Sequence, residues 1–177
     1  MAGEEQQDEQ QEGLAASRYN FDTIEEYIST AERLAEEGRV DEAVDILREA
    51  TDKYPQNAHA YYDLGVTIFM KLREDLAHLE LWENLADDEE LAEECHFAFQ
   101  SAIQRDPTMV AAYTNLGTLL ALRGRVRKAI ESWEKSLELN PNQPELAADV
   151  AMYRSQLNED DVMRQRQAPG EPPPQDA

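Results

Sequence analysis

The sequence is poor in several kinds of residue, and each shortage excludes a class of protein. Among its 177 residues there is one cysteine, Cys95, which cannot form an internal disulfide and fits a reducing compartment. No apolar run reaches the ~18 residues that a transmembrane helix needs. The first residues, MAGEEQQDEQQEG, are acidic and polar, the opposite of a secretory signal. We therefore expect a soluble, cytoplasmic protein with no membrane partner.

Positive charge is also scarce. The chain has 16 lysines and arginines against 38 aspartates and glutamates, which gives a net charge of −22. Because contacts to a phosphate backbone need a basic face, this balance argues against a nucleic-acid partner. Only four of the cations are lysines. The sequence leaves two interpretations open: the acidity reflects a high-salt environment, or it reflects a partner.

What the sequence does contain is a repeated helical pattern, which is clearest between Val110 and Gln143. Gly124 falls between two amphipathic segments, at the position of a left-handed helix-ending residue, and Pro141 follows the second segment. This pattern predicts a helical hairpin of 34 residues, which cannot bury its apolar face without neighbours. The apolar residues recur at spacings of three and four: Tyr113, Leu116, Leu120, Ala129, Ile130, Trp133 and Leu137.

Two earlier copies of the hairpin precede this one. The first runs from Ile24 to Asn57, with its turn at Gly38 and Pro55 closing its second helix, and Asp22 or Thr23 can cap its first helix. The second begins at Ala58 and is interrupted, because about 18 extra residues separate its two helices when it is aligned with the third copy.

These copies resemble the tetratricopeptide repeat, whose pattern is Trp-x2-Leu-Gly-x2-Tyr, then Ala-x3-Phe, then Pro. The first copy is the weakest match, because Thr30 and Ala31 replace the Leu-Gly pair. The third copy matches the pattern at Tyr113, Leu116, Gly117, Leu120, Ala129, Trp133 and Pro141, and the second at Tyr61, Leu64, Gly65, Ile68, Cys95, Phe99 and Pro107. The resemblance implies an all-α fold, a right-handed superhelical stack of helical hairpins (an α-solenoid).

The expected organisation is an acidic arm, a repeat domain and a proline-rich tail. Residues 1–18 and 158–177 have little to bury, so we expect both to be disordered. The repeat domain, 19–157, consists of repeats 24–57, 58–109 and 110–143, an insertion at about 71–94, and a capping helix at 144–157.

The insertion contains neither glycine nor proline, so we expect it to be helical. Asp87 followed by Glu90 predicts a capping box that opens the second helix. The residues ahead of it either prolong the first helix or form a short extra one. Leu79, Trp82 and Leu85 either pack locally on the second helix or form an exposed contact surface.

The sequence offers no catalytic or cofactor-binding site, and we predict that the protein is not an enzyme. Its three histidines, His59, His78 and His96, have no ligand spacing that suggests a metal. Cys95 stands where the other repeats have Ala43 and Ala129, which favours a packed core thiol over a nucleophile.

The resemblance implies a concave groove lined by the first helix of each pair. Relatives that hold the acidic C-terminal tail of large chaperones use a clamp of Lys, Asn and Arg, whereas Ile28, Glu32, Ala111 and Asn115 stand here. We expect the groove to suit a segment with apolar anchors and some positive charge. The residues predicted to line it are His59, Tyr62, Val66, Phe69, Met70, Thr114, Asn115, Thr118, Leu122 and Met152.

The sequence therefore predicts a protein–protein interaction module or scaffold that binds a peptide or protein segment in its groove, with the insertion as an extra contact surface. Two alternatives are a self-associating structural protein, a homodimer through Leu79, Trp82 and Leu85, and a chaperone-like holder of apolar segments.

Overall fold

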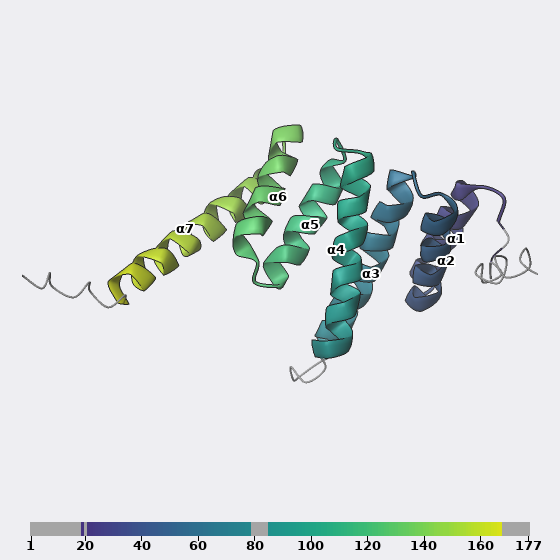
Figure 1. The fold of residues 1–177 in the computed structure, drawn as a ribbon, viewed down its shortest axis with the longest axis horizontal. Helices are drawn as coiled ribbons and strands as arrows, with labels where there is room; N and C mark the ends of the chain where they lie inside the picture. The colour runs from purple at the N-terminus through teal and green to yellow at the C-terminus, as the bar shows by residue number, and fades with distance from the viewer. Residues whose placement is uncertain (1–18, 20, 79–84, 168–177) are drawn as a thin grey trace, which may run out of the picture. The chain divides into compact units, whose positions relative to one another are not determined.

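The computed structural model describes residues 19, 21–78 and 85–167, and for 74–78, 85–88 and 160–167 it describes the backbone only. The described residues form α-helices and no strands, so the all-α fold class predicted from the sequence is confirmed over this part (Figure 1). The chain divides into two compact units, Met1–Arg105 and Asp106–Ala177. The helices are α1 (Ile24–Glu36), α2 (Val40–Lys53), α3 (Ala58–His78), α4 (Leu85–Arg105), α5 (Val110–Leu122), α6 (Val126–Leu139) and α7 (Pro144–Gln167).

The first helix pair, α1 and α2, forms where the sequence predicts it. Of the two candidate caps, Thr23 is the one used, and it makes a reciprocal capping box with Glu26. Gly38 ends α1 with a φ of 76°, a left-handed conformation that glycine adopts without steric cost. The two helices bury their facing apolar residues, among them Tyr27 and Leu47, both 1% exposed.

The second pair is longer than an ordinary repeat. Both α3 and α4 have 21 residues, against 13 in α5 and 14 in α6, so the insertion prolongs both helices of the pair. The predicted capping box is wrong as a helix start, because α4 already includes Leu85 and Asp87 lies inside its first turn. The segment between the two helices, residues 79–84, lies outside the described residues.

A glycine lets α3 and α4 approach closely. A Cβ on Gly65 would lie only 2.7 Å from Cδ1 of the fully buried Phe99, so only glycine fits this crossing without movement. Cys95 is fully buried beside it and donates its Sγ–H to the Gly65 carbonyl at 3.3 Å. The prediction that Cys95 is a packed core thiol is confirmed.

In the second unit, α5 and α6 repeat this arrangement. Gly117 lies directly under the indole of Trp133, whose Nε1 donates to the Thr114 carbonyl at 3.1 Å. Gly124 ends α5 with a φ of 69°, as predicted. The periodicity of the most regular repeat in the sequence therefore gives the expected hairpin.

The last helix, α7, packs on α6 and is longer than predicted. Val150 is buried, Tyr153 packs on Trp133 with ring centroids 5.2 Å apart, and Arg154 pairs with Glu134. The helix passes Leu157, where we expected the capping helix to end, and continues to Gln167. The reason is local: between Leu157 and Pro169 there is no proline or glycine to stop a helix. Of the predicted tail, residues 168–177 lie outside the described part, as does the acidic arm 1–18.

Candidate functional site

The predicted groove residues of the first unit share one face of α3. Ala60, Tyr61, Leu64, Thr67 and Ile68 are buried on the opposite face. The groove residues follow helical spacing and all keep some exposure; His59 and Met70 are exposed, Met70 at 41%. They are His59, Tyr62, Val66, Phe69 and Met70. Tyr62 also packs on Phe99, with ring centroids 6.2 Å apart, so it contributes to the core as well as to this face.

This face carries a carboxyl group in an unfavourable setting. Asp63 on α3 is half-buried, and its burial raises its pKa to about 6, with a further contribution from the negative charge of Glu32 on α1. His59, also on α3, acts in the opposite direction and lowers the pKa of Asp63. Helices α1 and α3, the first helices of two consecutive pairs, contact each other. The carboxylates of Glu32 and Asp63 therefore face the same region. A cationic group bound there would relieve the repulsion between the two carboxylates.

In the second unit the predicted residues also lie on the less buried side of their helices. Thr118 and Asn115 are half-buried, while Leu122 and Met152 are 59% and 48% exposed. The side chain of Thr114 is engaged internally, because its hydroxyl lies 2.7 Å from that of Ser136 on α6. The grouping of these residues with those of α3 in one groove stays a prediction.

The insertion surface stays a prediction too. Leu79 and Trp82 lie outside the described residues, and Leu85 is placed only as the first residue of α4. The homodimer hypothesis, which depends on these three side chains, is likewise untested.

Sequence reasoning missed one exposed aromatic residue. Phe97 on α4 is 61% exposed. A signal was available, because repeat alignment places it where Asp45 and Glu131 stand, at positions that otherwise carry charge. Phe97 therefore provides an exposed aromatic side chain on the second helix of the pair, outside the predicted groove.

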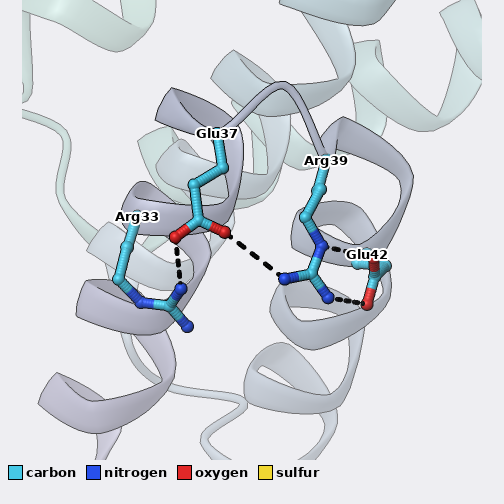
Figure 2. Close-up of polar contacts among 4 residues, drawn as sticks. All are labelled: Arg33, Glu37, Arg39 and Glu42. Carbon is cyan, nitrogen blue, oxygen red and sulfur yellow. Dashed lines mark hydrogen bonds and ion pairs between the residues drawn. The ribbon is translucent and has the colours of Figure 1, made fainter.

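The turn between α1 and α2 is held by a chain of ion pairs, shown in Figure 2. Glu37 accepts from Arg33 at 2.6 Å and from Arg39 at 3.3 Å, and Arg39 in turn pairs with Glu42 at 2.6 Å. The hydrogen bond from Arg33 is the largest cause that lowers the pKa of Glu37. These groups are exposed, so the pairs add little to stability and mainly fix the polar outer side of the first helix pair.

A second polar contact joins the first helix pair to the second. Arg48 on α2 makes a bidentate pair with Glu94 on α4, with Nε–Oε1 and Nη2–Oε2 distances of 2.7 and 2.6 Å. The hydrogen bond to Glu94 is the main cause that raises the pKa of Arg48. Lys71 on α3 pairs with Asp41 on α2. Both contacts bridge consecutive repeats.

The described residues hold no group of three or more His, Cys, Asp or Glu side chains placed to bind a metal ion. Over the same residues, no helix combines the length and the apolar character needed to cross a membrane.

Paired antiparallel helices, with a glycine at the crossing of α3 with α4 and of α5 with α6, define a helical-repeat protein. Two models of the tetratricopeptide repeat match the sequence, one over residues 29–87 and one over 110–143. Together they cover more than half of the chain, which belongs to the tetratricopeptide repeat family. The first match runs from the middle of α1 into the insertion, and the division into three repeats with an insertion remains our interpretation.

Among curated proteins the chain is similar to the antiviral innate immune response effector IFIT1 of Homo sapiens, with 23% identity over 125 residues. The match covers 69% of this chain but 26% of IFIT1, so the chain spans about a quarter of that relative's length.

Among solved structures it resembles the first TPR of Spaghetti (RPAP3) bound to the HSP90 peptide SRMEEVD, with a TM-score of 0.62 and 16% identity, covering 76% of this chain and 93% of that one. It also resembles the Arabidopsis OM64 TPR domain, with a TM-score of 0.60 and 16% identity, covering 75% of this chain and 94% of that one. At these identities the likeness concerns the fold. The fold is one that supports a protein–protein interaction scaffold, a role that is generally non-enzymatic.

Proposed function

We propose that this protein is an interaction module that binds a partner segment on the inner faces of its first helices, and that in the first unit the segment carries apolar side chains and a positive charge. The observation that carries the proposal is the face of α3, where half-buried and exposed apolar side chains stand beside Asp63. The tetratricopeptide fold supports the general role of a scaffold.

The apolar part of this face can hold anchor side chains. Phe69 and Val66 are half-buried and Met70 is 41% exposed, one or two helical turns from Tyr62. Covering such side chains with a partner removes apolar area from water, worth roughly 25 cal/mol per Å² before the costs of association.

The charged part of the face favours a cation. The burial of Asp63, together with its repulsion by Glu32, makes a further negative charge unfavourable here. The chaperone peptide in the Spaghetti complex has the sequence SRMEEVD and is rich in acidic residues. Ile28, Glu32, Ala111 and Asn115 stand where the clamp for such a tail has Lys, Asn and Arg, so an acidic tail would meet no fixed cation and we expect this chain to disfavour it.

The test is a capture experiment from native extract with quantitative identification of bound proteins. The full chain is compared with Phe69→Ala/Met70→Ala, which removes apolar side chains from the proposed face. Phe97→Ala is the matched control, since Phe97 is an exposed aromatic residue on α4 outside it. We expect wild type and Phe97→Ala to retain the same proteins and the double variant to lose them. Equal capture by all three would overturn the proposal.

The charge preference is tested separately with Glu32→Gln/Asp63→Asn. We expect weaker capture and a shallower dependence on salt, because two negative charges no longer attract the partner. If affinity for the same proteins is unchanged at low and high salt, the partner does not place a cation there.

A further inference from the structure

A short segment ahead of α1 lies across the first helix pair, and its backbone is held by side chains. We call Tyr19, Phe21 and Asp22 the N-terminal strap. Tyr27 on α1 donates its hydroxyl to the Tyr19 carbonyl at 2.9 Å. At the end of α2, Lys53 donates to the Phe21 carbonyl, and Tyr54 donates to the Asp22 carbonyl at 2.8 Å. Three donors of the first helix pair therefore bind three strap carbonyls.

The side chains of the strap are packed as well. Phe21 meets the ring of Tyr27 edge-on, with centroids 5.0 Å apart and an interplanar angle of 84°. Tyr19 stacks on Phe21 at 6.1 Å and 4°. Lys53 lies over the ring of Tyr27 at 5.4 Å, where a cation is attracted to the aromatic face. The surface thus has an aromatic floor formed by Tyr27 and a row of hydrogen-bond donors at its edge.

The same arrangement recurs in the second helix pair. Arg105 lies over the ring of Tyr61 at 4.0 Å, and its Nε donates to the Pro55 carbonyl at 2.6 Å. Pro55 precedes Tyr61 by the same number of residues as Phe21 precedes Tyr27. There, however, the bound backbone is the turn between α2 and α3 and is fixed by a helix on each side. In the described part of the chain the strap adjoins a helix on one side only.

We propose that Tyr27, Lys53 and Tyr54 form a second segment-binding surface, separate from the groove, which the strap occupies in cis and from which an outside segment can displace it. The partner that fits is an extended segment with two aromatic side chains two residues apart, as Tyr19 and Phe21 are. Specificity comes from the aromatic spacing, since the donors contact backbone carbonyls that every sequence offers.

Occupation in cis makes the surface hard to reach. A tethered segment is present at an effective concentration on the order of millimolar, so a free segment competes poorly unless the strap is weakened or held elsewhere. A molecule that binds the strap and removes it from Tyr27, Lys53 and Tyr54 would expose the surface. The strap is therefore an autoinhibitory element.

The test uses the full chain and a fluorescent peptide with the sequence of residues 16–23, followed by fluorescence anisotropy. Wild type is compared with Tyr19→Ala/Phe21→Ala, in which the strap loses both rings. We expect the double variant to bind the peptide at least about tenfold more tightly than wild type, because the tethered competitor is weakened. Adding Lys53→Met/Tyr54→Phe, which removes two donors, should reverse that gain. A peptide with its two aromatic residues moved to adjacent positions is the specificity control.

Four outcomes overturn the proposal. The strap is a permanent part of the fold if the double variant keeps its helical circular dichroism but does not bind the peptide. The strap does not block the surface if wild type binds the peptide as tightly as the double variant does. The occupant is a second copy's strap if wild type dimerises and the peptide dissociates the dimer. Phe21→Ala alone, which keeps Tyr19, is measured in parallel, and a smaller gain in binding is expected; if the double variant unfolds, absence of any gain in Phe21→Ala overturns the proposal.

Discussion

Replacing Asp63 by asparagine should stabilise the protein, although the change removes a native charge. Asp63 is half-buried on α3, and its pKa is raised to about 6 from an ordinary value of 3.8. At pH 7 the folded state therefore holds a carboxylate that would be more stable in the unfolded chain. Asparagine has nearly the same shape and no charge, so Asp63→Asn removes this cost.

The magnitude follows from the shift in pKa. One pKa unit corresponds to about 1.4 kcal/mol, so the full shift would give about 3 kcal/mol. Asp63 keeps contact with water, which screens its interaction with Glu32, and we reduce the expected gain to about 1 kcal/mol at pH 7.

The raised pKa also predicts how the difference in stability between wild type and Asp63→Asn changes with pH. Between about pH 4 and pH 6 the folded chain retains a proton on Asp63 that the unfolded chain has released, so wild type loses stability relative to the variant as pH rises through this window. Below about pH 4 Asp63 becomes protonated in both the folded and the unfolded state, so the difference in stability between wild type and variant should no longer change with pH.

Urea denaturation of both proteins from pH 4 to pH 7.5, followed by circular dichroism, measures this difference. The matched control is Asp149→Asn on the exposed side of α7. The reasoning would be refuted if the difference between wild type and Asp63→Asn were constant across the window, or if the control showed the same pH-dependent gain.

Three further changes test the packing and capping described above. Gly117→Ala should destabilise the protein by about 1–3 kcal/mol, because a Cβ there would collide with the indole of Trp133; urea denaturation measures it, and a neutral result would mean that α5 and α6 can separate freely. Thr23→Ala should cost about 1 kcal/mol through loss of the capping box with Glu26, and Thr23→Ser should restore most of it. Tyr153→Ala should loosen α7, because it removes the ring packed on Trp133; faster amide hydrogen exchange in α7 with unchanged exchange in α5 is expected, and uniform exchange changes would contradict a local role.

The helix pairs were predictable because their signals are local. An amphipathic helix is indicated by apolar residues at spacings of three and four. The turns at Gly38 and Gly124 need a residue in the left-handed conformation at one position. The choice of Thr23 over Asp22 as the cap was left open by sequence because either oxygen can bind the first free amides; the observed choice depends on where the first turn begins.

The errors in the prediction are also local in origin. Asp87 and Glu90 have the spacing of a capping box, but a helix that has already begun upstream uses both as ordinary helical residues. Residues 158–177 have little to bury and are therefore predicted to be a tail, yet a helix continues to Gln167, because helix formation needs only the absence of breakers and a packed segment to extend from.

The candidate site likewise contains features that helical spacing predicts and features that it does not. The face of α3 that carries Tyr62, Phe69 and Met70 could be assigned from helical spacing alone. The internal bond of Thr114 to Ser136 could not, because it depends on how α6 packs against α5.

By itself, then, the sequence determined the repeat family, the helix pairs and the small residues at their crossings, since each follows from residues close together in the chain. Only the tertiary structure decided that the half-buried Asp63 lies within reach of the negative charge of Glu32 and that Lys53 and Tyr54 hold the backbone of the strap. Burial and electrostatic repulsion act between groups that are near in space. The local spacing of three and four residues in a helix does not connect side chains about thirty positions apart, so the packing of the helices determines those interactions.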